Sequence, residues 1–290
     1  MRMAIVLAWL WQTAEVTTPE GRKFFHLPDE GNLAAQAEAL RGKDGATAEE
    51  LLAAGKIYDD LWWFSRSIAV YSEGMRRFAG DFRFPRFRGH RYFSTRQFAK
   101  GVEDLEKARE LAPASFDVSY HLGLGYYLMG EFGKAAEAYG RCLEMTGKTG
   151  PAAPGGARSC TELHTAENSR VAISEWMYRS LRRAGKHGEA AALLGGIGEG
   201  MKVTTNESYY LSLLFYKGRR KEEAIVPGAK AEKGNTFSTV GYGVANFHLL
   251  EGRKARGCEM LRKIVNERAW NAFGFIAAEA DLARGVCGGN

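Results

Sequence analysis

The chain has 290 residues, of which 45% are hydrophobic and 26% are charged. This hydrophobic fraction is enough to bury a sizeable core and excludes wholesale disorder, and helix-forming segments separated by glycine predict a mostly helical protein. The formal charge of +6 favours acidic partners, but it is also ordinary for a soluble protein of this length, because acidic and basic residues are interleaved.

The N-terminus is the first segment with a recognisable pattern. Met-Arg is followed by an apolar run that ends at Trp11, which is typical of a short secretory signal peptide with cleavage near Ala14. The run is far shorter than the roughly 20 residues that span a membrane, so no membrane span is expected. A buried N-terminal helix or a truncated signal also fits residues 1–14, which leaves a periplasmic and a cytoplasmic location both open.

A repeated pattern of glycine and aromatic residues follows an N-terminal extension at 15–47, in which positions 33–42 favour a capping helix. The repeat has Leu-Gly, an aromatic residue three positions on, a turn glycine, a small residue and a second aromatic. In the clearest copy these positions are Leu122, Gly123, Tyr126, Gly130, Ala135, Tyr139 and Cys142. The pattern returns 34 residues earlier, and again 34 residues before that. Its spacing resembles that of tetratricopeptide repeats, whose unit is a pair of helices joined by a short turn.

Each repeated position has a physical role in such a unit. Gly123 lets the first helix approach its neighbour closely, since a β-carbon there would push the two apart. Gly130 closes the first helix in a left-handed conformation. Ala135 fits the tight crossing of the two helices, and Tyr139 fills the space between successive repeats. In the earliest copy Trp62 stands at the turn position.

The second half of the chain repeats the pattern in a weaker form. A Gly/Pro-rich segment at 150–170 predicts a loop, after which turn glycines resume at Gly185, Gly218 and Gly252, separated by 33 and 34 residues. Pro227 lies in the second helix of one copy and predicts a kink or an early stop there. The predicted elements are hairpins at about 48–81, 82–115, 116–149, 171–203, 204–237 and 238–268, followed by a capping helix and tail at 269–290.

The resemblance implies an all-α fold, a right-handed α-solenoid of about six helical hairpins with a C-terminal capping helix. It also implies a binding scaffold that is not an enzyme and whose concave surface is lined by the first helix of each hairpin. Transferring the inner-face positions gives a groove with basic ends and an aromatic middle, which would suit a peptide or protein segment bearing acidic groups. The predicted binding residues are Arg83, Arg86, His90, Phe93, Tyr120, Leu124, Tyr127, Glu175, Arg179, Arg182, Arg183, Tyr242 and Asn246.

The arginine- and aromatic-rich stretch at 76–96, RRFAGDFRFPRFRGHRYFSTR, supports a second interpretation. Guanidinium groups bind phosphate or carboxylate and aromatic side chains stack on bases, so this composition fits an anionic ligand. The aromatics would serve equally well as packing positions of the second hairpin. A nucleic-acid-binding helical repeat protein and an accessory subunit of an enzyme complex are therefore the alternatives to the protein-binding scaffold.

No motif in the sequence carries catalytic, metal or cofactor chemistry. The histidines lack the paired spacing of metal ligands, and no Ser, Cys or carboxylate lies in a nucleophile motif. Gly147-Lys148-Thr149 ends like a phosphate-binding loop, but Cys142 stands where that loop needs a glycine. Neither a cofactor, a metal nor a small-molecule ligand is expected.

The four cysteines show no CxxC spacing. In an exported protein the pairings between neighbours in the sequence are Cys142–Cys160 and Cys258–Cys287. In a cytosolic protein the same residues would be small buried side chains and a loose thiol in the tail.

Overall fold

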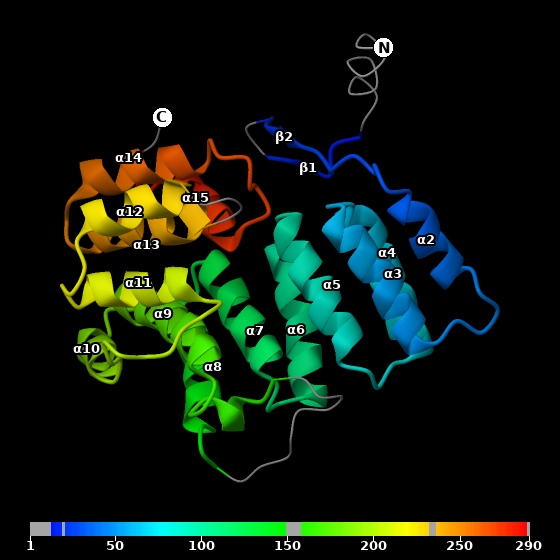
Figure 1. Ribbon diagram of the computed structural model, residues 1–290, viewed down its shortest axis with the longest axis horizontal. Helices are drawn as coiled ribbons and strands as arrows, with labels where there is room; N and C mark the ends of the chain where they lie inside the picture. Colours follow the sequence, from blue (N-terminus) through cyan, green and yellow to red (C-terminus); the bar gives the residue numbers. More distant parts are fainter. Residues whose placement is uncertain (1–12, 19–20, 149–157, 232–235, 289–290) are drawn as a thin grey trace. The chain divides into compact units, whose positions relative to one another are not determined.

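The computed structural model of the protein describes residues 13–18, 21–148, 158–231 and 236–288 (Figure 1). The possible signal peptide lies, except for its last two residues, outside this part of the chain. Regular structure in the described residues is helical apart from the short antiparallel strands β1 (Val16–Thr17) and β2 (Lys23–Phe24). Among these residues, none of the helices combines the length and the apolar character that a membrane crossing requires.

The helices fall into two compact units, Met1–Leu111 and Ala112–Asn290. In unit 1 each helix packs against the next along the chain. The helices of unit 1 are α2 (Leu33–Arg41), α3 (Ala48–Asp60), α4 (Phe64–Arg77), α5 (Arg83–Ser94) and α6 (Phe98–Leu111). Thus α2 takes the place of the expected capping helix, and α3–α4 and α5–α6 are two helical hairpins.

Unit 2 contains the remaining hairpins, in which the second helix of each pair contacts the first (Figure 1). Its helices are α7 (Phe116–Leu128), α8 (Phe132–Glu144), α9 (Glu167–Arg183), α10 (His187–Gly195), α11 (Glu207–Tyr216), α12 (Glu222–Ala231), α13 (Thr236–Leu250), α14 (Lys254–Ile264) and α15 (Phe273–Ala283). We call α7, α9, α11 and α13 the first helices of unit 2, and α8, α10, α12 and α14 its second helices.

A residue with positive φ stands between the two helices of every described hairpin. These residues are Trp62, Arg96, Gly130, Gly185, Gly218 and Gly252. At Gly130 φ is 82°, and the next amide donates to the carbonyl of Tyr126, which closes the end of α7. The turn glycines of the sequence pattern are therefore confirmed, and two larger side chains adopt the same backbone conformation.

Close approach of helices at glycine is also confirmed. A β-carbon at Gly123 of α7 would lie 2.5 Å from the ring of Tyr139 on α8. Tyr139 and Ala135 are fully buried at this crossing. The repeat signature therefore marks positions at which the two helices of a hairpin interlock.

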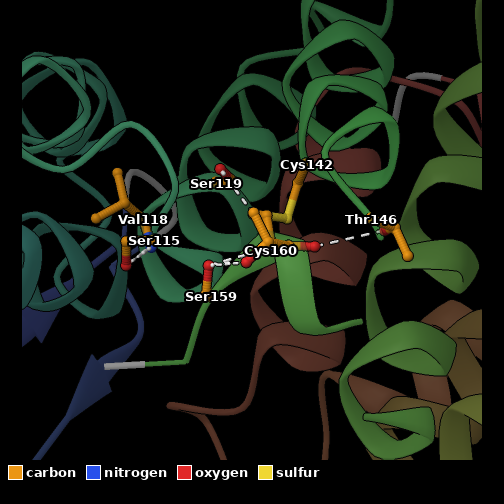
Figure 2. Close-up of a disulfide and its surroundings, with 8 residues drawn as sticks. Ser115, Val118, Ser119, Cys142, Thr146, Ser159 and Cys160 are labelled. Atoms are coloured by element: carbon orange, nitrogen blue, oxygen red, sulfur yellow. Dashed lines mark hydrogen bonds between the residues drawn. A yellow bond between two sulfur atoms is a disulfide. The ribbon is translucent and has the colours of Figure 1, made fainter. Parts of the chain in front are cut away.

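Residues 158–166, just before α9, are held by several bonds (Figure 2). Cys142 and Cys160 form a disulfide, and the short 3-10 helix η3 (Cys160–Glu162) lies against the end of α8. Ser159 forms an isolated β-bridge with Ser115, just before α7. Helix α9 begins at Glu167, slightly before the predicted start at 171, and residues 150–157 of the expected loop lie outside the described part of the chain.

Helix α12 does not stop at Pro227, so the expected early stop is wrong. The helix runs on to Ala231. A proline removes one backbone hydrogen bond from a helix, and here packing of α12 against α11 and α13 holds the helix together.

Candidate functional site

The predicted site residues of unit 1 lie on α5. Phe93 is fully buried, whereas Arg83, Arg86 and His90 are half-buried. Arg83 Nη1 lies 2.6 Å from Glu49 Oε1, and its Nη2 lies 2.6 Å from Asp81 Oδ2. The hydrogen bond with Asp81 raises the pKa of Arg83. Its guanidinium group is thus already held by carboxylates of the same unit.

Two other arginines of the 76–96 stretch, Arg88 and Arg91, also pair with carboxylates. Arg88 makes two hydrogen bonds of 2.7 Å with the carboxylate of Asp104. Arg91 Nε lies 3.5 Å from Asp59 Oδ1, in a buried pair. These guanidinium groups pair with internal carboxylates, so they do not form a row of free groups that could bind phosphate.

The predicted site residues of unit 2 are brought together, but mostly in the interior. Seven of them are less than 10% exposed: Tyr120, Leu124, Tyr127, Glu175, Arg179, Tyr242 and Asn246. The side chains of Arg182 and Arg183 are 16% and 11% exposed. These residues do not line an open groove.

Packing among the first helices and packing of helix α15 together cause this burial; for example, the hydroxyl group of Tyr120 on α7 lies 2.8 Å from that of Tyr209 on α11. Helix α15 packs against α13 and α14 and also contacts α7. At Gly274 of α15 an added β-carbon would lie 2.1 Å from the carbonyl oxygen of Ser238 on α13. Arg284, just beyond α15, donates through Nη1 to the carbonyl of Leu128 at 2.7 Å. Helices α7 and α13 are therefore partly covered by the helix that was expected only to cap the last repeat.

The carboxylate that these residues bind belongs to the chain itself. Asp281 of α15 is fully buried, and its Oδ2 lies 2.7 Å from Arg183 Nη2 and 2.8 Å from the hydroxyl of Tyr242, which donates to it. Arg284 Nη2 donates to Asp281 Oδ1 at 2.6 Å. Arg183 also donates through Nε to Asn246 Oδ1 at 2.8 Å. The acidic group expected from a ligand is thus supplied internally by Asp281, a residue that the sequence analysis missed.

A second buried ionic group lies on α9 and α11. Arg179 forms an ion pair with Glu175, one helical turn away, and donates through Nε to the hydroxyl of Tyr216 at 3.2 Å. That hydroxyl donates to Glu175 Oε1 at 2.7 Å. Burial raises the pKa of Glu175, and the charge of Arg179 opposes this shift. Both charged side chains are at most 1% exposed, so the pair lies in the interior and does not face solvent.

An open groove lies instead between α8 and α10, and residues of α9 form its base. It has a volume of about 400 Å³. Its lining residues are Ala136, Glu137, Gly140, Arg141, Glu144, Met177, Leu181, Lys186 and Glu189. We call this the α8–α10 groove. A β-carbon at Gly140 would contact the Met177 methyl group at 3.5 Å, so the missing side chain leaves space above the floor.

Charged residues border this apolar floor. Arg141 lies 3.8 Å from Glu137 on α8, and Lys186 lies 3.3 Å from Glu189 at the start of α10. Glu144, the last residue of α8, forms no ion pair with any described residue. The groove was not predicted, because the predicted binding residues were all placed on first helices. The local signal for the groove was Gly140, since glycine is unfavourable inside a helix.

Helical hairpins that repeat every 33 or 34 residues, with a left-handed residue in each turn, define the fold of a tetratricopeptide-repeat array. The chain is similar to the crystal structure of a tetratricopeptide repeat protein from Parabacteroides merdae ATCC 43184. The TM-score is 0.53 at 15% sequence identity, and the match covers 86% of this chain and 93% of the other. No protein-family model and no curated protein sequence matches the chain. The predicted resemblance is therefore confirmed at the level of the fold.

Proposed function

We propose that the protein is a non-catalytic interaction scaffold that holds a segment of a protein partner in the α8–α10 groove. The observation that supports this function is a groove in which Gly140 and Met177 are partly exposed above the buried side chains of Ala136 and Leu181, and which is bordered by charged side chains. Apolar pockets with polar rims are typical of protein-binding surfaces, in which a few buried anchors supply most of the affinity.

The frame around this groove is suited to a binding role. Buried ion pairs and the Cys142–Cys160 disulfide fix α8 and α9, so little conformational entropy is lost when a partner binds. In unit 2, the acidic segment predicted to bind on the first helices would have to displace α15 and its carboxylate, Asp281. We therefore place the partner on the second helices. No contact in the described residues favours nucleic-acid binding.

Site-specific photo-cross-linking in cells that produce the protein would test this function. A cross-linking amino acid at Arg141 should give an adduct with a partner, whereas the same group at Ala191, which is exposed on α10 outside the groove, should give none. Gly140→Phe fills the groove and should reduce the adduct roughly tenfold or more, as expected when an anchor worth about 1.4 kcal/mol is lost.

Circular dichroism of the Gly140→Phe protein should show an unchanged helical spectrum, which excludes unfolding as the cause. Equal adducts at both positions, or an adduct that survives Gly140→Phe, would contradict the groove as the binding surface.

A further inference from the structure

The groove also indicates the chemistry of its partner, an inference that rests on the proposed function. Gly140 of α8 and Met177 of α9 are partly exposed in the groove, above the buried side chains of Ala136 and Leu181. Because Gly140 has no side chain, the end of Met177 is accessible from the groove. Met177 is a flexible, polarisable side chain that adapts its shape to an inserted group. The groove therefore suits one aliphatic anchor of a partner segment.

The charges at the rim favour a basic flank beside that anchor. Arg141 pairs with Glu137, and Lys186 pairs with Glu189. The carboxylate of Glu144 is therefore left without a cationic partner among the described residues. Glu144 is the last residue of α8, where the carbonyl groups at the helix end carry partial negative charge. The end of α8 and the carboxylate of Glu144 together give this end of the groove a negative electrostatic potential.

We propose that the occupant of the α8–α10 groove is a protein segment with an aliphatic anchor followed by Lys or Arg that pairs with Glu144. This reverses the charge expected from the sequence, because the arginines that suggested an acidic partner are paired internally. The rim side chains are about half-exposed, for example 50% for Arg141 and 62% for Glu137. Solvent therefore limits the ionic contribution, which should change affinity by about two- to fivefold.

NMR of the full chain labelled with ¹³C at methionine methyl groups would test this proposal, because the Met177 methyl group lies at the groove. The probes are two synthetic helical peptides with the same leucine anchors, one flanked by arginine and one by glutamate. Met177→Leu assigns the signal. We expect the arginine-flanked peptide to shift the Met177 signal and to bind more tightly than the glutamate-flanked one.

Two charge variants complete the test. Glu144→Gln should weaken the arginine-flanked peptide about two- to fivefold, whereas Glu223→Gln, at an exposed carboxylate on α12, should leave its affinity unchanged. Tighter binding of the glutamate-flanked peptide, no effect of Glu144→Gln, or no Met177 shift with either peptide would overturn the proposed partner chemistry. A cross-link at Arg141 that is still observed would then show that the scaffold function holds without this partner chemistry. If neither the cross-link nor the peptide binding is observed, both proposals are wrong.

The cysteines carry a second, independent inference. All four are paired, Cys142 with Cys160 and Cys258 with Cys287, as the sequence-local pairing predicted. The Cα atoms of the two pairs are 5.0 Å and 5.7 Å apart, within the ordinary range for disulfides. At Cys160 the backbone is held as well, because its amide donates to the carbonyl of Ala114. The pairing thus belongs to the fold.

We infer that the protein folds in an oxidising compartment, since structural disulfides persist there and are rare in the reducing cytosol. Protein isolated from its source should be denatured without reductant, treated with a maleimide and weighed by mass spectrometry. We expect no modification before reduction and one maleimide per cysteine afterwards. Modification of any cysteine before reduction would overturn the inference.

Discussion

Glycine residues have different physical roles at different positions in this chain. Gly130 has a positive φ and closes a helix, and Gly123 makes room for the ring of Tyr139. Gly140 does neither, since its φ is not in the left-handed region and a β-carbon there would meet only the end of Met177. The glycine in the groove is therefore not required by the fold.

This difference predicts opposite effects of the same substitution. Gly140→Ala should stabilise the protein by up to about 1 kcal/mol, because alanine is the better helix former and a contact of 3.5 Å is ordinary. Gly123→Ala should destabilise it by about 1–3 kcal/mol, because the new methyl group would lie 2.5 Å from Tyr139. Urea denaturation followed by circular dichroism measures both, and equal shifts of the two midpoints would contradict the assignment.

Several site residues could be predicted individually, but not their environment. The inner-face positions Tyr127, Arg183 and Tyr242 follow from the repeat spacing, and the structure does bring them together. Their burial depends on α15, whose contact with α7 joins residues distant in the sequence. The local signal was weak, because α15 carries two carboxylates, Glu279 and Asp281, and the sequence does not show that Asp281 is the fully buried one.

At the scale of elements, α3 shows how local sequence begins a helix. Thr47 Oγ1 accepts from the amide of Glu50, and the Glu50 carboxylate accepts from the amide of Thr47 at 2.9 Å. Lys43 Nζ also donates to Glu50 Oε1 at 2.5 Å. This capping box ties the first turn of α3 to the preceding loop.

The capping box gives a specific pH dependence. The hydrogen bonds from Lys43 and then from Thr47 lower the pKa of Glu50 to about 2, from an ordinary value of 4.5. Because the pKa of the folded state is below that of the unfolded state, this stabilisation is fully present above pH 4.5 and is lost as pH falls towards 2. The ¹³C signal of the Glu50 carboxylate should titrate near 2, and Lys43→Ala should move its midpoint upward. A midpoint near 4.5 in the unaltered protein would contradict the capping geometry.

The positions of the helices were largely predictable, because the spacing of turn glycines and packing aromatics can be read directly from the sequence. The exceptions have non-local causes. Residues 158–166, just before α9, are held by the disulfide at Cys160 and by the bridge between Ser115 and Ser159, whose partners are distant in the sequence. Helix α12 passes Pro227 because neighbouring helices hold it.

At the scale of the whole molecule, the disulfides supply cross-links that supplement packing. They close loops of 18 and 29 residues in sequence. A cross-link restricts the unfolded chain, and loops of this size correspond to about 3 kcal/mol each in the chain-entropy account.

Removal of either pair should therefore destabilise unit 2. Cys142→Ala with Cys160→Ala should lower the free energy of unfolding by about 3 kcal/mol, and Cys258→Ala with Cys287→Ala by a similar or slightly larger amount. Alanine avoids placing new hydroxyl groups in the interior. Chemical denaturation with and without reductant checks the effect: reductant should destabilise the unaltered protein but not a variant that lacks all four cysteines.

The covering of the first helices by α15 determines which positions in residues 112–290 can change during evolution. A substitution at Tyr242 or Arg183 must also satisfy α15, so it needs a compensating change elsewhere. The exposed positions of α8 and α10 outside the α8–α10 groove carry no such obligation and can change one at a time. Divergence among related sequences should therefore concentrate on the second helices, the reverse of an array whose inner face is open.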